Sequence, residues 1–257
     1  MQVEGRVALV TGAGSGIGEA AVRLLVGQGA KVAAVGRTDK ELERVVSDLG
    51  DAAMPVVADI SRVDEMERAV GQVVERWGRL DVVFANAGVN GVWAPIEELA
   101  PEEWRRTLDI NLTGTFLTVK YAVPHLKRRG GSVIITSSVN GTRIFSNTGA
   151  TAYSCSKAGQ VALAKMMALE LAPHRVRVNV ICPGAIESPI HDKTVRRHVE
   201  EVQIPAEYPE GEMPLTGGEM GSPDQVARLV LFLASEASDL ITGTEIWIDG
   251  AESLLRG

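Results

Sequence analysis

The chain has 257 residues, of which 45% are hydrophobic and 23% charged, enough to bury a complete core in one α/β domain. Its formal net charge of −7 excludes the positive surface that nucleic acid or an anionic membrane attracts. No apolar run approaches the roughly 18 residues of a membrane span, so we expect neither a nucleic-acid nor a membrane partner.

Cysteine and histidine usage argues against disulfide and metal chemistry. Cys155 and Cys182 lack the spacing of a metal or redox pair, as expected in a reduced compartment. The histidines form no pair three or four residues apart, so we expect no metal site. The first apolar run begins near residue 7, which leaves little room for a secretory leader. We therefore predict a cytoplasmic protein.

Short β-branched runs alternate along the chain with longer segments of helical period. This alternation predicts right-handed βαβ crossovers, and hence a parallel sheet with helices on both faces. The runs are almost wholly apolar, as expected when both faces are covered. We predict one doubly wound α/β domain over residues 1–257, with a mostly parallel seven-stranded sheet. Its predicted strands are Val7–Val10, Val32–Val35, Ala53–Val57, Val82–Ala85, Val133–Thr136, Val176–Ile181 and Glu245–Ile248.

Two features between the strands give sharper expectations. Thr38 followed by Glu41 predicts a capping box at a helix start. A long helix is expected from Pro101 to about Arg129, and Pro124 should kink or break it.

Residues 188–221 are irregular, being rich in proline, glycine and acidic side chains, with one short helix expected near Asp192–Val202. Long irregular segments are usually functional lids or disorder. This segment follows the sixth strand at the carboxyl edge of the sheet, where ligands bind in such folds. We therefore predict a substrate lid.

A glycine-rich turn follows the first strand. Gly12 would allow the tight turn, Gly16 would let backbone amides approach a pyrophosphate, and Gly18 would permit close packing of helix on strand. The helix N-terminus would then hold the phosphates. The pattern predicts a dinucleotide cradle, with a purely structural glycine-rich turn as the alternative.

Tyr153 and Lys157 lie one helical turn apart, which places both side chains on one face. Reduction of a carbonyl by hydride leaves an alkoxide that needs a proton, so such a site requires an acid that donates near neutral pH. A cation about 4 Å away at an effective dielectric near 20 contributes roughly 4 kcal/mol, or about 3 pKa units. We therefore expect Lys157 to lower the pKa of Tyr153.

Over almost its whole length the chain resembles the short-chain dehydrogenase/reductase family. The resemblance implies a Rossmann fold and hydride transfer between NAD(P) and a secondary alcohol or ketone. It rests on the cofactor motif Thr11-Gly12-x-x-x-Gly16-Ile17-Gly18, the strand-four motif Asn86-Ala87-Gly88, and four positions similar to the catalytic residues, Asn111, Ser138, Tyr153 and Lys157.

The resemblance also implies roles. Tyr153 would be the acid/base, Lys157 would tune it and hold the nicotinamide ribose, and Ser138 would hydrogen-bond the substrate oxygen. We choose Ser138 over Ser137 because Val139-Asn140-Gly141 follows it in the family's manner and alternate residues at a strand end point oppositely. Asn111 would support a water-linked proton path to Lys157, with a buried hydrogen bond as the alternative.

A larger set of positions would bind the cofactor. Asp59 would contact adenine together with Ile60, although a helix-capping role for Asp59 stays open. Ser188 stands where the family more often has threonine, and its hydroxyl can still donate. The predicted cofactor-binding residues are Gly12, Ser15, Gly16, Ile17, Gly18, Arg37, Thr38, Asp59, Ile60, Asn86, Ala87, Gly88, Tyr153, Lys157, Pro183, Gly184, Ile186 and Ser188.

The end of the second strand bears on the choice between NAD and NADP. Gly36 stands where an acid would accept from the ribose 2′-OH, and Arg37 follows with a donor fork suited to phosphate. Asp39 falls in the first turn of the next helix, where a carboxylate complements the dipole. Ser15 supplies no second cation, which argues for NAD. The pattern favours NADP over NAD.

Two other functions are considered. A 3-oxoacyl thioester reductase would need a basic patch for an acidic carrier, and the acidic segment 188–221 argues against it. A non-catalytic dinucleotide-binding regulator would not need all four catalytic positions filled. The substrate itself is not predicted beyond a small carbonyl or alcohol. For Trp93 and Phe145, ordinary loop packing is the alternative to a place in the pocket. The residues that could line an apolar pocket are Trp93, Ile144, Phe145, Ile190 and Tyr208.

The helix expected over Ala150–Ala172 is apolar nearly all round, and helices of that kind are buried. One face must meet the sheet, and a second subunit is the simplest cover for the rest. The resemblance implies a homotetramer built on this helix, on the Pro101–Arg129 helix and on the C-terminal segment Ile241–Leu255.

Overall fold

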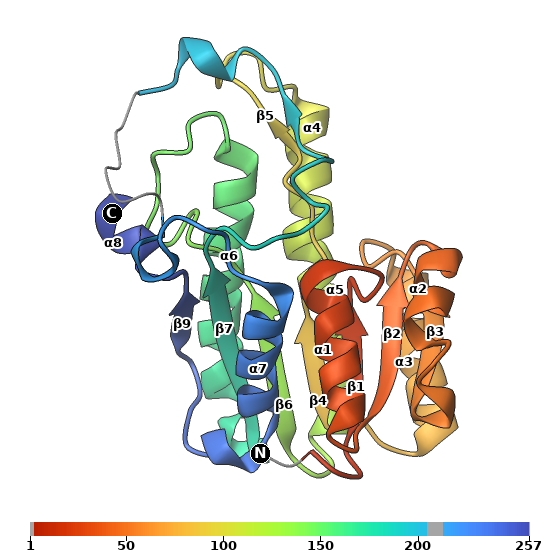
Figure 1. Ribbon diagram of the computed structural model, residues 1–257. Coiled ribbons are helices and arrows are strands. Elements are labelled where there is room, and N and C mark those ends of the chain that lie inside the picture. Colours follow the sequence, from red (N-terminus) through yellow and green to blue (C-terminus); the bar gives the residue numbers. More distant parts are fainter. Residues whose placement is uncertain (1–2, 205–212, 257) are drawn as a thin grey trace.

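The computed structural model describes residues 3–204 and 213–256. Its centre is a seven-stranded sheet, parallel throughout, with strand order β3-β2-β1-β4-β6-β7-β9 (Figure 1). The predicted fold class is confirmed, and each predicted strand is present to within about two residues at its ends. The strands are β1 (Val7–Thr11), β2 (Lys31–Gly36), β3 (Ala53–Val57), β4 (Val82–Ala85), β6 (Gly131–Thr136), β7 (Val176–Pro183) and β9 (Glu245–Ile248).

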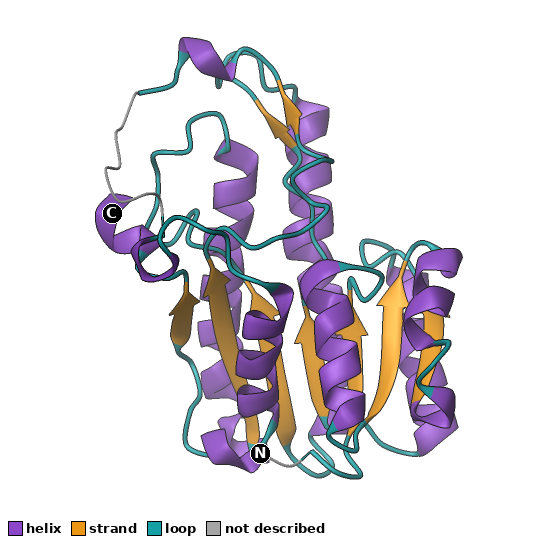
Figure 2. Ribbon diagram, viewed as in Figure 1, coloured by secondary structure: helices purple, strands orange, loops and turns teal. Residues whose placement is uncertain are grey.

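Helices cover both faces of this sheet (Figure 2). On one face, α1 (Gly16–Gly27), α2 (Asp39–Val46) and α7 (Pro223–Ala234) contribute to one apolar cluster. On the other face, α3 (Val63–Trp77), α5 (Gly114–Leu126) and α6 (Thr151–Leu171) contribute to a second. The strand residues divide between the two clusters by alternation, which explains why the strands are apolar on both sides.

The long helix expected from Pro101 to about Arg129 is interrupted, but not at Pro124, where the sequence predicted a kink or break. The α4 helix (Pro101–Leu108) passes into a π-helical turn (Asp109–Thr113) and then into α5. Pro124 lies within the last turn of α5, so little helix remains beyond it to be kinked. The irregularity instead surrounds Asn111, one of the predicted catalytic residues.

The short helix expected near Asp192–Val202 is absent there. That stretch forms turns, a two-residue strand β8 (Val195–Arg196) and a 3-10 turn, Val199–Glu201. Strand β8 pairs in parallel with β5 (Val92–Trp93), so the first part of the predicted lid is fastened to the loop that follows β4. Residues 205–212 of the predicted lid lie outside the described part of the chain.

The predicted capping box at α2 is wrong in its side chains. Thr38 is the N-cap residue, but its hydroxyl makes no capping hydrogen bond. Glu41 is turned instead toward the glycine turn, where its Oε2 would lie 2.9 Å from a Cβ on Gly14. The carboxylate thus faces the carboxyl edge of the sheet and not the helix start.

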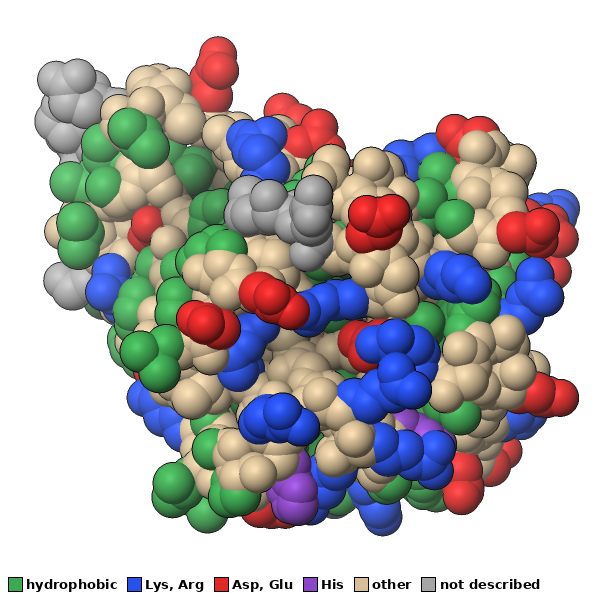
Figure 3. Space-filling model, turned by 90° about the horizontal axis from the view of Figure 1, so that it is seen from below, with side chains coloured by type: hydrophobic (Ala, Val, Ile, Leu, Met, Phe, Trp, Pro, Cys, Tyr) green, Lys and Arg blue, Asp and Glu red, His purple; other side chains and the backbone are tan. Residues whose placement is uncertain are grey.

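The amino-terminal edge of the sheet, on the opposite side from the lid, carries interspersed acidic and basic side chains (Figure 3). None of the helices in the described ranges is both long and apolar enough to cross a bilayer. The last helix, α8 (Glu252–Arg256), returns to the carboxyl edge beside β9 (Figure 1).

Candidate active site

A cleft of about 690 Å³ opens along the carboxyl edge of the sheet, a size typical of small-molecule and cofactor sites. Most of the residues predicted from the sequence line it. Gly16, Gly18 and Asn111 are the predicted positions that do not line the cleft themselves. The predicted residues that line it are Gly12, Ser15, Ile17, Arg37, Thr38, Asp59, Ile60, Asn86, Ala87, Gly88, Ser138, Tyr153, Lys157, Pro183, Gly184, Ile186 and Ser188.

The glycine turn forms a cradle that side chains would fill. Gly12 has a φ of +67°, and a Cβ there would lie 2.9 Å from the Cα of Ala87. A Cβ on Gly18 would collide with the carbonyl of Gly12, so helix α1 packs closely on the turn. Gly16 has a φ of +54° and faces the hydroxyl of Ser188. Bare backbone at a helix N-terminus fits the pyrophosphate of a dinucleotide.

Asn86 ties the ends of three strands together. Its backbone N–H and that of Ala87 donate to Oγ1 of Thr11, at 3.0 and 3.1 Å. Its Nδ2 donates to the carbonyl of Thr11 at 3.1 Å, and its Oδ1 accepts from Thr136 at 3.1 Å. The strand-four motif therefore fixes the floor of the cleft beneath the glycine turn.

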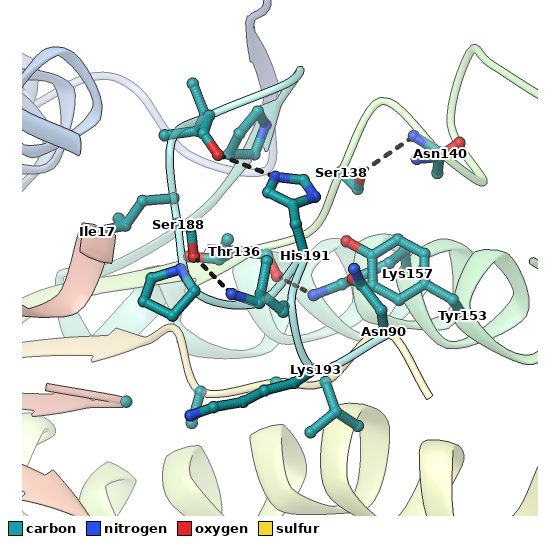
Figure 4. A pocket seen from close by; sticks show the side chains of 18 of the residues that line it. Ile17, Asn90, Thr136, Ser138, Asn140, Tyr153, Lys157, Ser188, His191 and Lys193 are labelled. Carbon is teal, nitrogen blue, oxygen red and sulfur yellow. Dashed lines mark hydrogen bonds between the residues drawn. The ribbon is translucent and has the colours of Figure 1, made fainter. Parts of the chain in front are cut away.

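Tyr153 and Ser138 reach the cleft from different elements. Tyr153 lies in the first turn of α6, and Ser138 follows β6 (Figure 4). The hydroxyl of Tyr153 is turned toward Ser138, whose Oγ accepts from the backbone N–H of Asn140 at 3.1 Å. The neighbouring Ser137 donates instead to the carbonyl of Lys157 at 2.8 Å and is buried. Of the two serines, Ser138 is the one whose hydroxyl is available to a ligand beside Tyr153.

Lys157 is buried beneath Tyr153. Its Nζ donates to the carbonyl of Thr136 at 2.9 Å and lies 5.4 Å from the centroid of the Tyr153 ring. Burial lowers the pKa of Lys157 to about 8. Lys157 therefore loses its proton at a lower pH than an exposed lysine does.

The expectation that Lys157 lowers the pKa of Tyr153 is not what the structure gives. Burial raises the pKa of Tyr153 above its usual value, and the hydrogen bond with Ser138 offsets this only in part. The thiol of Cys182 adds to the upward shift. The main reason is the desolvation of the phenolate, and the Lys157 ammonium is hydrogen-bonded to the Thr136 carbonyl.

Asn111 is fully buried and committed to hydrogen bonds within the protein. Its Oδ1 accepts from the N–H of Val89 at 2.8 Å, and its Nδ2 donates to the Val89 carbonyl at 2.9 Å. Nδ2 also donates to Oγ of Ser156 at 3.0 Å. Of the two roles considered for Asn111, the structure displays the buried hydrogen bonds, which join the loop after β4 to helix α6.

At the end of the cleft beside β2 and β3, Asp59 is bound to its own neighbour. Its Oδ1 accepts from the N–H and hydroxyl of Ser61, at 2.9 and 2.7 Å. Burial alone would raise the pKa of Asp59, but these bonds, with the nearby charge of Arg37, leave that pKa below its usual value. The N-cap of α3 is Arg62, so the Asp59 side chain does not cap the helix directly.

The substrate side of the cleft is more polar than the sequence suggested. Trp93 and Ile190 line it, but Ile144 is buried in the protein and Phe145 is 71% exposed and absent from the lining. Tyr208 lies outside the described residues. Polar and basic lining residues that the sequence analysis missed are Asn90, Asn140, Ser146, Asn147, Thr148, His191, Lys193 and Arg196.

Neither cysteine lines the cleft. Cys182 is buried in the protein, where desolvation raises its pKa to about 12, and Cys155 is on the surface. In the described part of the chain, no group of three or more His, Cys, Asp or Glu side chains is placed to hold a metal ion.

Known proteins share this fold and much of this sequence. A family model described as enoyl-(acyl carrier protein) reductase matches residues 12–251. A crystal structure of a 3-ketoacyl-ACP reductase from Sinorhizobium meliloti 1021 is 48% identical with a TM-score of 0.93, covering 97% of this chain and 100% of that one.

Curated relatives of different specificity are also similar. A 3-oxoacyl-[acyl-carrier-protein] reductase of Thermotoga maritima is 37% identical, over 97% of this chain and 98% of its own length. A cyclohexanol dehydrogenase of an Acinetobacter species is 35% identical, over 96% and 94%. The chain therefore belongs to the short-chain dehydrogenase/reductase family, and it is an NAD(P)-dependent oxidoreductase that acts on CH–OH groups.

Proposed function

We propose that Tyr153 is the acid/base of reversible hydride transfer between the nicotinamide cofactor and a secondary alcohol or ketone. The observation that supports this most is the meeting of the Tyr153 hydroxyl with Ser138, above the buried ammonium of Lys157, in the cleft that the glycine turn closes. The bound nicotinamide supplies or accepts the hydride. The side chains described here then account for the accompanying proton.

In the reducing direction, the hydroxyls of Ser138 and Tyr153 donate to the substrate oxygen and stabilise the charge that develops there. Tyr153 then transfers its proton to that oxygen, which leaves a phenolate. The positive charge of Lys157 lies on the same helix, one turn away, and offsets part of the cost of burying this phenolate. In the oxidising direction the phenolate takes the proton from the alcohol.

For the cofactor we propose NADP, with NAD as the alternative. Arg37 and Thr38 line the adenosine end, and Arg37 offers a guanidinium fork to a 2′-phosphate. Glu41 also lines the cleft, beside Gly14, and its carboxylate is the group that would favour a 2′-hydroxyl. A 3-ketoacyl-(acyl-carrier-protein) reductase from Brucella melitensis, 32% identical to this chain, is complexed with NADH, which supports a nicotinamide dinucleotide here and keeps NAD as the alternative.

The second candidate is a 3-oxoacyl thioester reductase. It is favoured by the relatives of that name and by Lys193 and Arg196, which put positive charge in the cleft wall. We rank it second because segment 188–221 is rich in acidic residues, and because Arg197, the next cation in the segment, is already paired with Glu103. Residues 188–221 act as a substrate lid in both versions of the proposal.

We further propose a cytoplasmic homotetramer. Met166 and Leu169 on α6 are 74% and 81% exposed, so apolar surface remains on this helix after it has packed on the sheet. Hydrophobic side chains also gather on the flank that carries β9 and α8 (Figure 3), where Leu254 is exposed. Exposed apolar surface of this extent is typical of subunit interfaces.

A substrate panel tests the proposal. Oxidation of cyclohexanol and reduction of cyclohexanone would be compared with reduction of acetoacetyl-CoA, each with NADPH or NADH and their oxidised forms. Turnover of the small alcohol or ketone is expected to exceed that of the thioester. A preference for acetoacetyl-CoA by tenfold or more in kcat/KM would instead establish the second candidate.

A further inference from the structure

Gln160 lies three residues after Lys157 on helix α6, and its side chain is fully buried. Its Nε2 donates two hydrogen bonds, one to the carbonyl oxygen of Asn111 and one to Oγ1 of Thr115, both at 2.8 Å. Thr115 Oγ1 in turn donates to the same carbonyl at 2.7 Å. The three groups form a closed triangle between α6 and the π-helical turn.

The geometry of the π-helical turn explains why hydrogen bonds from side chains are useful in holding it. The N–H of Gly114 bonds to the carbonyl of Asp109, five residues back, so the turn is wider than a regular helix. Such turns are rare and are frequently found at functional sites. At this turn the Asn111 carbonyl accepts from Gln160 and Thr115, and these bonds fix the backbone that carries the Asn111 side chain.

The Asn111 side chain passes this constraint on in two directions. It hydrogen-bonds to both the backbone N–H and the backbone carbonyl of Val89. It also donates to the hydroxyl of Ser156, which in turn donates to the carbonyl of Tyr153 at 2.6 Å. The loop that it grips also contains Gly88. A Cβ there would lie 3.1 Å from Oδ1 of Asn111 and 3.6 Å from Nζ of Lys157.

The hydrogen bonds of the Gln160 amide indicate that its Nε2 donors are needed at this position. Among the described residues, no group donates to its buried Oε1. A buried acceptor without a partner is unfavourable, whereas methionine would fill similar space without that cost. The two bonds made by Nε2 offset this cost; one ends on Asn111 in the π-helical turn and the other on Thr115 in the first turn of α5.

We infer that Gln160 is a positioning residue of the active site: it locks the π-helical turn, and through Asn111 it sets the cofactor-binding loop Asn86–Val89 against Lys157. This inference rests on the proposed function. It predicts that loss of the Gln160 amide weakens cofactor binding and slows turnover, although the side chain does not itself line the cleft.

The test compares Gln160→Met with Asn179→Leu. Asn179 is another fully buried amide, bonded to the carbonyl of Ile241 at 2.7 Å, and it does not line the cleft. Dissociation constants for NADPH and NADH are measured by fluorescence titration on folded protein, together with kcat and KM for cyclohexanol or the best substrate of the panel. Thermal unfolding is recorded for every variant.

Gln160→Met is expected to weaken binding of the preferred cofactor about fivefold and to lower kcat about tenfold, with the substrate KM within about twofold of wild type. Asn179→Leu is expected to lose thermal stability with the cofactor dissociation constant unchanged. A structural role alone would make the two variants alike. Wild-type cofactor affinity and kcat in Gln160→Met would overturn the inference.

Thr115→Val provides a second arm, which decides the matter if Gln160→Met does not fold. It removes one corner of the triangle and leaves the Gln160–Asn111 bond, so a smaller change in the same direction is expected. Unchanged cofactor affinity in a folded Thr115→Val, with no folded Gln160→Met, would count against the inference. The proposed function fails separately, if Tyr153→Phe keeps its activity, whatever Gln160 does.

Discussion

The ammonium of Lys157 donates a 2.9 Å hydrogen bond to the carbonyl of Thr136, the last residue of β6. This bond anchors the charged group at the strand end from which Ser138 enters the cleft, so the serine and the lysine share one rigid support. The same burial that anchors Lys157 lowers its pKa to about 8. Function and stability are therefore coupled through one side chain.

Lys157→Met should reveal that coupling in the pH dependence of stability. The folded-state pKa lies below the unfolded value near 10.5, so the native state binds fewer protons between pH 8 and 10.5. The penalty for burying the charge is fully present below pH 8 and is relieved as the pH rises. Relative to Lys157→Met, wild type should gain up to roughly 3 kcal/mol of unfolding free energy across this window. Urea unfolding at pH 7 and pH 9.5 measures the trend, and a difference independent of pH would contradict it.

The two adjacent serines make a matched pair. Ser138→Ala should lower kcat/KM by about 10²-fold, because it removes a hydroxyl that faces the substrate oxygen. Ser137→Ala removes a buried bond to the Lys157 carbonyl and should cost about 1 kcal/mol of stability while leaving most turnover. Steady-state kinetics and thermal unfolding of both variants decide this. Equal losses of turnover in the two would show that the serines are wrongly assigned.

Arg37→Asp should shift preference from NADP toward NAD. It deletes the proposed partner of the 2′-phosphate and adds a carboxylate near the 2′ position. Glu41→Gln is the companion variant, since Glu41 is the carboxylate already in this part of the cleft, and it should move the preference the other way. The ratio of kcat/KM for the two cofactors is the measurement. A wild type that prefers NAD by more than tenfold would refute the choice of NADP.

The assembly is tested at α6. Met166→Asp and Leu169→Asp place charges at positions that are mostly exposed in a single chain, so the fold should survive. In a tetramer these positions are buried and the charges should separate subunits. Sedimentation velocity at micromolar concentration should give wild type four times the 27.4 kDa chain mass and the variants a smaller species. A wild-type chain that sediments only as monomer would refute the proposed assembly.

The seven strands and their parallel arrangement could be predicted because most of the strands are buried on both faces and therefore leave short β-branched runs in the sequence. Strands β5 and β8 left no such signal, since each has two residues and exists only through pairing between segments far apart in the chain. The π-helical turn could not be predicted from the sequence, because it too depends on contacts with a distant part of the chain. Its residues continue the helical pattern, and its geometry depends on Gln160, which approaches from another helix.

At the site, the glycines and the Tyr153/Lys157 pair could be identified because local geometry imposes their spacing. Properties that depend on the folded surroundings could not. The upward shift of the Tyr153 pKa comes from burial, which a sequence does not display. The polar wall around Asn140 and the exposure of Phe145 likewise follow from how one loop packs, whereas the sequence suggested that Phe145 lines an apolar pocket.

The most direct test of the central claim is the turnover of Tyr153→Phe, which removes the ionisable hydroxyl and little else. The account predicts a fall in kcat of at least about 10²-fold, because positioned acid–base catalysis contributes 10² to 10⁴. The cofactor dissociation constant, measured on the same preparation, should stay within about twofold of wild type. A variant that keeps more than about a tenth of the wild-type kcat would contradict the assignment of Tyr153 as the proton donor.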